Sequence, residues 1–418
     1  GTQTLRDVSV LTAWDAVSIE RHLDDPVVFL STNSRALDEA NAIAVTADAA
    51  THARQAASIT WRPVSFISRS DSTLRGHFPA EVDALAEAAG MPEARVLLAP
   101  YFGEGGRVTI DDVHYLDRDG TRTPVAETEF AHDATFGYRS SNLRDWVAEK
   151  YAGAGRPAPM MSSLTLEVVR SGGPEAVAEV LRALAPGGIA IANAEVDRDI
   201  EVVALGSLLA EEHDLPLVAR TAASYVRARA GRAPAPLLTP AELDTDGPGL
   251  IVVGSHVETT SRQLDHLLQS DSVVAHELAV DALLAGGRTT EQAVRGAAAA
   301  LDAALGGGRI GVVSTTRVRY DVGLDGGRAI SSALVESVRR VGTRPGWVVA
   351  KGGITGYDVA TGALGMREAR VAGQLLAGVP VWIGGEGSRW PGAPLVVFPG
   401  NVGSVDALSS VVALLSGR

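Results

Sequence analysis

Residues 347–355 read WVVAKGGIT, an apolar, β-branched run that ends in a lysine and two adjacent glycines. A run of this kind, bounded by glycine, predicts a buried strand followed by a tight turn. Glycines leave backbone N–H groups uncovered, and such groups at the end of a strand bind phosphate and other anions. The stretch therefore predicts a strand end of an α/β sheet that holds a nucleotide phosphate.

The same layout recurs before and after this stretch. Gly254 and Ser255 follow the run GLIVV, residues 399–403 (PGNVG) follow LVVF, and Gly384 and Gly385 also follow an apolar run. Ligands of open α/β sheets bind outside the carboxyl ends of the strands, where such turns lie. Any single cluster is equally typical of an ordinary turn, and the phosphate-loop pattern GxxxxGK[ST] is absent. Their repetition in one region favours a nucleotide site.

A proline-rich segment divides the chain of 418 residues into two parts. It covers residues 233–249, where the prolines exclude a regular helix or a central strand. Residues 1–232 and residues 250–418 are both of ordinary domain size. We therefore expect two domains joined by a linker at residues 233–249.

Strand and helix patterns alternate in both parts. The expected strands are residues 26–31, 64–68, 95–99, 188–193, 249–253, 273–277, 311–314, 347–350, 380–383 and 395–398. The expected helices are residues 38–57, 80–89, 175–184, 200–212, 261–269, 292–305, 330–341 and 405–415, and a further helix is expected from about Tyr357. This alternation predicts two α/β domains with mainly parallel, helix-covered sheets and a cleft between them. Residues 101–170 are less regular and are expected to form an insertion with a few strands.

The composition excludes several classes of protein. The net charge is −13 and the pI is about 5.2, which argue against nucleic acid or an anionic membrane as a partner. The chain has no cysteine, so disulfides and thiolate metal sites are excluded. No apolar run is long enough to cross a membrane and no signal peptide is visible, so we expect a cytoplasmic protein. Because the chain starts at Gly1 without a methionine, we also expect that residues precede it.

Polar side chains crowd two strand ends of the first part. Residues 68–76 (SRSDSTLRG) follow one predicted strand, and residues 31–35 (STNSR) follow another. Arginine holds a carboxylate through two parallel hydrogen bonds, and serine and aspartate bond sugar hydroxyls. The two segments together indicate a polyhydroxy acid as the ligand, although helix capping with surface arginines gives the same pattern.

Asp111, Asp112 and His114 are a weaker candidate. An Asp-x-His pattern beside a second acid is compatible with a metal site. A hairpin turn at Asp111 and Asp112, with His114 as an ordinary strand residue, explains the pattern better. The motifs GxSxG and HExxH are absent and no dinucleotide GxGxxG lies in its usual place, so hydrolase and dehydrogenase functions lack their local signatures.

Over nearly its whole length the sequence resembles the four-carbon acid-sugar kinases, which act on threonate, erythronate and 3-oxo-tetronate. The resemblance rests on TNSR (residues 32–35), RSDSTLRG (69–76), Gly254-Ser255, GGIT (352–355) and GNVG (400–403), of which DSTLRG is the most specific. It implies an N-terminal domain that binds the acid sugar and a C-terminal domain that binds ATP. Members of the family are often homodimers.

The resemblance also implies site residues. The acid sugar would be held by Arg35, Arg69, Ser70, Asp71, Ser72 and Arg75, with Asp71 as the catalytic candidate. ATP would be held by Ser255, Gly352, Gly353, Ile354, Thr355, Gly400, Asn401 and Gly403. The implied reaction transfers the γ-phosphoryl group of ATP, with Mg²⁺, to the terminal hydroxyl of a four-carbon sugar acid, while Lys351 and the glycine loops neutralise charge.

The sequence departs from the family in two places. The family opens with an aspartate loop that contacts the substrate, and this chain begins about where that loop ends, so the general base is either Asp71 or an aspartate upstream of Gly1. Ile354 stands where members commonly carry an acid, which leaves Asp358 as a candidate for magnesium. Two other functions remain open: a sugar-phosphate isomerase or aldolase that uses the same loops without ATP, and a non-enzymatic sensor of acid sugars.

Overall fold

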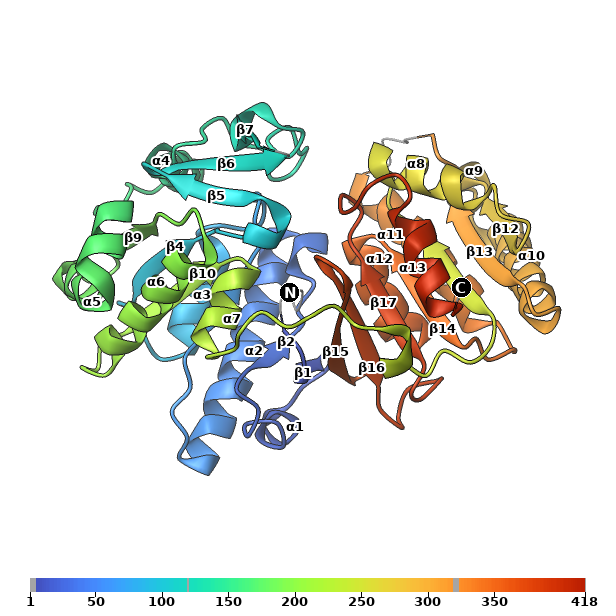
Figure 1. The fold of residues 1–418 in the computed structure, drawn as a ribbon, viewed down its shortest axis with the longest axis horizontal. Coiled ribbons are helices and arrows are strands. Elements are labelled where there is room, and N and C mark those ends of the chain that lie inside the picture. Colours follow the sequence, from blue (N-terminus) through green and yellow to red (C-terminus); the bar gives the residue numbers. More distant parts are fainter. Residues whose placement is uncertain (1–4, 119, 319–322, 418) are drawn as a thin grey trace. The chain divides into compact units, whose positions relative to one another are not determined.

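The structure, a computed structural model, describes residues 5–118, 120–318 and 323–417. The chain forms two compact units (Figure 1). Trp14–Pro234 makes up the first unit, and Leu5–Ala13 together with Ala235–Arg418 makes up the second. The chain thus passes from one unit to the other inside the predicted linker, and a second time near residue 13.

Strand β1 (Val8–Leu11) explains why the N-terminal residues belong to the second unit. It pairs antiparallel with β15 (Glu368–Leu376), and all of its residues are buried. The sequence assigned residues 1–232 to the first domain, and the structure differs at this strand. The reason is that a local pattern carries no information on a partner strand so far along the chain.

A five-stranded parallel sheet forms the centre of the first unit, in the order β3-β10-β4-β9-β8. Its strands are β3 (Ile67–Arg69), β10 (Leu217–Thr221), β4 (Arg95–Ala99), β9 (Ile189–Ala192) and β8 (Met161–Leu164). Alternate residues of β4 pack into two hydrophobic clusters, Leu97 into one and Leu98 into the other. Both faces of the sheet are therefore covered, as expected for parallel strands.

The helices of the first unit lie along these two clusters. Residues of α5 and α6 belong to one cluster and residues of α3 and α4 to the other. The helices are α1 (Ala16–Glu20), α2 (Glu39–Thr60), α3 (Ala80–Ala88), α4 (Leu143–Gly153), α5 (Gly173–Ala183), α6 (Asp197–Glu211) and α7 (Ala223–Arg229), and a short strand β2 covers Val28–Leu30.

The predicted insertion forms a small sheet of its own. Strands β5 (Arg107–Ile110), β6 (Val113–Arg118) and β7 (Thr121–Pro124) pair antiparallel. Asp111 and Asp112 have φ angles of 51° and 62° in the turn between β5 and β6, which confirms the predicted hairpin. Strand β8 lies inside the range predicted as insertion but belongs to the main sheet.

The second unit contains a mixed sheet in the order β12-β13-β11-β14-β17-β16-β15-β1. The strands from β12 to β17 in this order run parallel, and β16, β15 and β1 run antiparallel to their neighbours. The bounds are β11 (Gly249–Val253), β12 (Val273–Leu278), β13 (Ile310–Thr315), β14 (Trp347–Lys351), β16 (Val379–Gly384) and β17 (Pro394–Phe398). The prediction of two α/β domains with mainly parallel sheets is confirmed.

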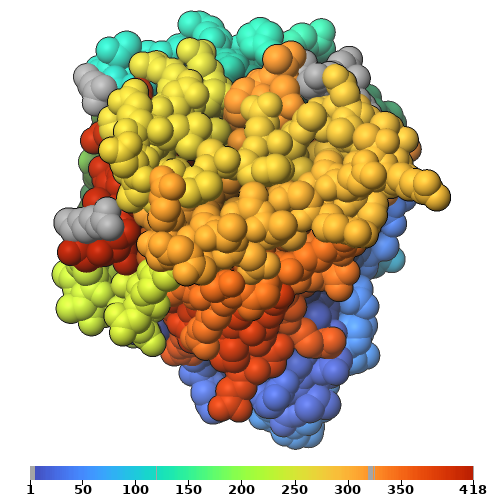
Figure 2. All heavy atoms as spheres, turned by 90° about the vertical axis from the view of Figure 1, so that its right-hand side faces the viewer, coloured from blue at the N-terminus to red at the C-terminus, as the bar shows by residue number. Residues whose placement is uncertain are grey.

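Helices cover the sheet of the second unit. They are α8 (Glu258–Leu267), α9 (Val280–Leu284), α10 (Gly287–Gly306), α11 (Gly323–Arg339), α12 (Gly353–Asp358) and α13 (Ala407–Leu415). Figure 2 shows the face where α9 and α10 lie, in yellow and light orange. None of the helices in the described ranges combines the length and the apolar character that a membrane crossing requires.

Candidate functional site

Three glycine-rich turns meet at one edge of the second unit's sheet. They follow β11, β14 and β17, which are parallel neighbours, so their carboxyl ends share that edge. The backbone N–H of Gly352 donates to the Phe398 carbonyl at 2.8 Å, and the N–H of Ser255 donates to the Lys351 carbonyl at 3.2 Å. The sequence-predicted residues Ser255, Gly352 and Gly400 are thus brought together.

The turns approach so closely that side chains at the glycine positions would collide. A Cβ atom on Gly400 would lie 2.4 Å from the Ser255 Oγ, and one on Gly254 would lie 2.4 Å from the Thr355 Oγ1. Gly352 also has a φ of 126°, which L side chains rarely adopt. The edge is therefore a surface of bare main chain with two hydroxyls, which fits the phosphates of a nucleotide.

Helix α8 holds the last of these turns in place. The Thr260 hydroxyl donates to the Gly400 carbonyl at 2.9 Å, and the Gln263 amide donates to the carbonyls of Val402, Gly403 and Ser404 at 2.7–3.2 Å. The sequence analysis missed both residues, since a polar side chain on a helix next to a loop has no signature of its own.

Lys351 does not project from the turn. It is fully buried, its Nζ donates to the Pro399 carbonyl at 2.7 Å, and the same atom lies 3.6 Å from the centre of the Phe398 ring. Burial lowers the pKa of Lys351 to about 7. The lysine therefore ties the second and third turns together, and the role of charge neutralisation that the sequence suggested for it does not fit its position.

Several other sequence predictions need correction or refinement. Helix α12 begins at Gly353 rather than near Tyr357, so Gly353, Ile354 and Thr355 lie in its first turn, with Ile354 40% exposed. The turn after β16, with Gly384 and Gly385, lies at the opposite edge of the sheet because β16 runs antiparallel to β17. It cannot join the other three turns.

Arg317 is a cation at this edge that the sequence analysis did not single out. It follows β13, and its guanidinium donates to the Ser255 carbonyl and, at 3.0 and 3.2 Å, to the Ser261 hydroxyl.

Asp358, the magnesium candidate, accepts a hydrogen bond from Ser331, and burial raises its pKa. Among the described residues no group of three or more His, Asp or Glu side chains could hold a metal ion.

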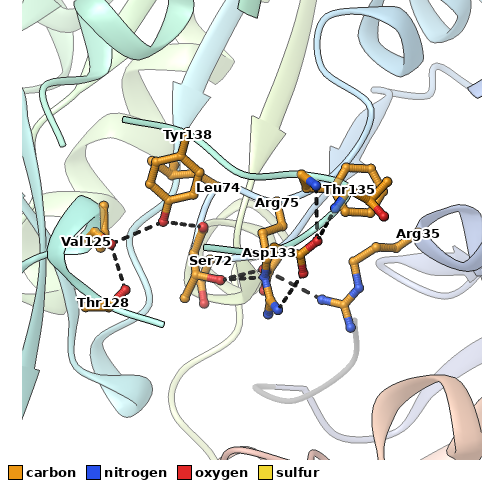
Figure 3. A network of polar contacts seen from close by, with 12 residues as sticks. Arg35, Ser72, Leu74, Arg75, Val125, Thr128, Asp133, Thr135 and Tyr138 are labelled. Atoms are coloured by element: carbon orange, nitrogen blue, oxygen red, sulfur yellow. Dashed lines mark hydrogen bonds and ion pairs between the residues drawn. The ribbon is translucent and has the colours of Figure 1, made fainter. Parts of the chain in front are cut away.

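In the first unit, the turn after β3 carries a network of polar contacts, the Asp71 network, and Figure 3 shows its members Arg35, Arg75 and Asp133. The Asp71 Oδ2 accepts hydrogen bonds from the Thr73 Oγ1 at 2.5 Å and from the Arg75 Nε at 2.7 Å, and it lies 3.6 Å from the Arg35 Nη1. Arg75 also reaches Asp133 at 3.5 Å. Arg35, Asp71 and Arg75, all predicted from the sequence, are therefore direct neighbours.

The charges around Asp71 keep it ionised. Burial alone would raise the pKa of Asp71, but the charges of Arg75 and Arg35 and the Thr73 hydrogen bond outweigh burial and hold the pKa well below its usual value. Arg69 is a further cation nearby, and burial lowers its pKa to about 10. The network thus carries an excess of positive charge at the carboxyl end of a parallel strand.

The backbone of this turn is fixed from two sides. The Ser70 N–H donates to the Thr221 carbonyl of β10 at 2.8 Å. The Ser72 carbonyl contacts the Nε2 of His114 at 2.9 Å, and the Thr73 carbonyl accepts from the Tyr138 hydroxyl at 2.9 Å. His114 is fully buried, which lowers its pKa to about 4, so it supports the turn as a neutral strand residue.

Two family models match this chain, one for each unit. Residues 1–229 match the model described as "Sugar-binding N-terminal domain", and residues 250–408 match the model described as "Nucleotide-binding C-terminal domain". The chain is also 27% identical over 281 residues to a D-erythronate kinase of Heliobacterium modesticaldum. That alignment covers 66% of this chain and 58% of the relative's own length.

Solved structures with the same fold are more distant in sequence. A Salmonella typhimurium LT2 protein described as a candidate tRNA synthase has a TM-score of 0.67 at 16% identity, over 96% of this chain and 97% of its own. A Haemophilus influenzae protein has a TM-score of 0.61 at 16% identity, over 99% of this chain and 95% of its own. These two likenesses concern the fold. The two domain models, which match in order along more than half of the sequence, establish that the chain belongs to the four-carbon acid-sugar kinase family.

Proposed function

We propose that this protein is an ATP-dependent kinase that phosphorylates the terminal hydroxyl of a four-carbon sugar acid, with D-erythronate as the first candidate and threonate and 3-oxo-tetronate as the next. D-Erythronate comes first because the relative from Heliobacterium modesticaldum carries that name. The matched region spans 58% of that relative, so the geometry of this chain has to support the assignment as well.

The observation that carries the proposal is the meeting of three glycine turns at one edge of the second unit's sheet. Backbone N–H groups of Gly353, Ile354 and Thr355 stand in the first turn of α12, and Gly352 and Gly400 lack the Cβ atoms that would fill the space before it. Ser255 and Thr355 add hydroxyl donors. We assign these residues, with Asn401 and Gly403, to the nucleotide, which supplies the phosphoryl group when bound.

The Asp71 network supports an acidic sugar as the acceptor. Arg35 is 38% exposed, and its 3.6 Å pair with Asp71 is loose, so its guanidinium is available for a carboxylate. Arg75 is committed to Asp71, Thr73 and Asp133 and serves to orient Asp71. We assign Arg35 and Arg69 to the carboxylate, and Ser70 and Ser72 to the sugar hydroxyls.

Asp71 is suited to orient a hydroxyl rather than to remove its proton early. A carboxylate whose pKa lies well below its usual value is a weak proton acceptor. Phosphoryl transfer through a loose transition state depends mainly on positioning and charge stabilisation, so a weak base suffices. In this proposal Asp71 accepts a hydrogen bond from the terminal hydroxyl of the acid and aims its oxygen at the phosphoryl group.

The test is an assay of ADP release with ATP–Mg²⁺ and a panel of D- and L-tetronates. A kinase releases ADP only when a suitable acid is present, and EDTA abolishes the release. ATP hydrolysis that no tetronate stimulates would refute the acid-sugar acceptor. Binding measurements separate the other two functions, since an isomerase or aldolase binds a phosphorylated sugar without ATP and a sensor binds the acid alone.

A further inference from the structure

Arg107, the first residue of β5, is a buried cation that the acid-sugar motifs do not include. The residue is 8% exposed. Its Nη1 donates to the Gly105 carbonyl, and its Nε is buried without a hydrogen-bond partner. Among the described residues no carboxylate forms an ion pair with Arg107. A buried guanidinium in this state is costly unless something else supplies the negative charge.

Two other buried arginines of the first unit have different surroundings. Arg227 is 1% exposed and pairs with Asp197 at 2.8 Å. Arg220 is 3% exposed and lies 5.1 Å from the centres of both the Phe78 and Trp146 rings. Arg107 has one ring, that of Phe130, at 5.9 Å. Among the described residues, neither Arg107 nor Arg220 therefore has a carboxylate within ion-pair distance, and Arg107 faces one ring where Arg220 faces two.

The fold makes room for Arg107 beside the Asp71 network. A Cβ atom on Gly105 would lie 2.6 Å from the Arg107 Nη1, so the glycine leaves the space that the guanidinium occupies. The Phe130 ring centre lies 5.0 Å from the Arg75 guanidinium and 5.9 Å from that of Arg107, and the charge of Arg107 interacts with those of Asp71, Arg118, Arg75 and Glu129. Since Asp71 is already paired with Arg35 and Arg75, and Glu129 with Arg118, neither carboxylate forms an ion pair with Arg107.

We propose that Arg107 binds the carboxylate of the acid substrate and is the residue that separates sugar acids from neutral polyols. The inference rests on the proposed function and adds a site residue to it. Because Nη1 is used by Gly105, the Nε and Nη2 atoms remain, and this edge of a guanidinium matches the two oxygens of a carboxylate. In this proposal the carboxylate of the ligand is the ion-pair partner that Arg107 lacks among the described residues.

The experiment compares D-erythronate with erythritol, which replaces the carboxylate by a hydroxymethyl group, by calorimetry and by steady-state kinetics. We expect Arg107→Met to weaken erythronate binding and to raise its KM by about 10- to 100-fold, with the KM for ATP unchanged. Arg107→Lys keeps a positive charge without the planar edge of the guanidinium, so its KM for erythronate should lie between those of the wild type and Arg107→Met. Arg139→Met is the matched control, since Arg139 lies in the same unit, is 89% exposed and pairs with Glu149.

The stability of the ligand-free variants guards against a merely structural effect. Loss of an uncompensated buried charge should leave the melting temperature of Arg107→Met equal to that of the wild type or higher, while the shift produced by erythronate disappears. A variant that binds erythronate as tightly as the wild type would overturn the inference, and so would a parallel loss of erythritol binding.

The two proposals fail in different ways. If the wild-type protein binds erythronate but transfers no phosphoryl group to any tetronate, the kinase assignment fails while the role of Arg107 stands. If the wild type transfers the group and Arg107→Met does so with the same KM, the kinase assignment stands and the inference on Arg107 falls.

Discussion

The Nζ atom of Lys351 donates a hydrogen bond of 2.7 Å to the carbonyl oxygen of Pro399, and this bond joins two of the three turns assigned to the nucleotide. The two residues are neighbours because β14 and β17 pair in parallel register, with Lys351 opposite Phe398. A lysine at the end of a strand beside two glycines therefore acts here through the shape of the loops.

Replacement of Lys351 by Met should separate these turns. We expect the KM for ATP to rise about 10-fold, with little change in the KM for the acid. At pH 9, where Lys351 is largely neutral in the folded protein, we expect the free energy of unfolding to fall by about 1 to 3 kcal/mol because the Pro399 carbonyl loses its donor. Lys150→Met is the control, since the Lys150 Nζ makes the same 2.7 Å bond to the Gly137 carbonyl in the first unit. An equal effect of both variants on the KM for ATP would contradict the role of Lys351.

The buried lysine also predicts a pH dependence of stability. The pKa of Lys351 is lowered to about 7 by burial in the folded protein, whereas in the unfolded chain it has its usual high value. Between these two pKa values the lysine is protonated in the unfolded state but not in the folded one, so the free energy of unfolding rises as the pH rises above about 7. Below about pH 7 the lysine is protonated in both states, and the full cost of burying its charge lowers the stability of the folded protein. The difference in unfolding free energy between the wild type and Lys351→Met should grow by up to about 1.4 kcal/mol per pH unit from pH 7 to pH 9. Denaturant titrations at several pH values measure it, and a constant difference would show that Lys351 is not perturbed.

Gly400→Ala tests the close approach of the turns. The new Cβ atom would lie 2.4 Å from the Ser255 Oγ, so either the turn or the serine has to move. We expect the KM for ATP to rise at least about 10-fold and the unfolding free energy to fall by about 1 to 3 kcal/mol. Gly296→Ala is the matched control, because nothing lies within 4 Å of a Cβ at that position in α10, and it should stabilise the protein by about 0.5 to 1 kcal/mol. If Gly400→Ala binds the nucleotide as tightly as the wild type, these turns do not form the nucleotide site.

Asp71→Asn removes the carboxylate that pairs with both Arg35 and Arg75 while it keeps the shape of the side chain. We expect kcat to fall about 100-fold or more, since the terminal hydroxyl loses its charged acceptor. The assay is ADP release at saturating ATP. Asp24→Asn provides the comparison, because Asp24 is 85% exposed and pairs with Arg62 at the surface. A variant at position 71 with normal turnover would show that Asp71 neither orients nor activates the acceptor.

Much of the fold could be predicted because apolar runs mark the strands. The bounds of β4 and β11 agree with the predicted residues 95–99 and 249–253. Strand β10 was missed, since its sequence LVART ends in an arginine and a threonine that are buried all the same. Such polar residues are tolerated in the core only because tertiary partners exist, and those partners do not show in a local pattern.

The sequence predicts which residues lie together where a motif falls within one turn, as for Asp71 and Arg75 or for Gly352 and Thr355. The position of the other glycines could not be predicted without the direction of their strands. The glycines after β16 have the same local pattern as those after β14 but lie at the other edge of the sheet, because β16 runs antiparallel to β17. Arg107 was missed for a similar reason, since its proximity to Asp71 arises from a separate sheet. The cleft expected between the two domains and the ligand contacts of the assigned residues stay predictions.

Strand β1 has a consequence for anyone who wishes to study the nucleotide half by itself. A fragment cut at the proline-rich segment would lack residues 5–13 and would leave the free backbone groups of β15 open to pairing with a second molecule. Such a fragment should aggregate on expression. A circular permutant that carries residues 5–13 behind residue 418, on a linker long enough to reach β15, should restore the missing strand and yield a monomeric domain.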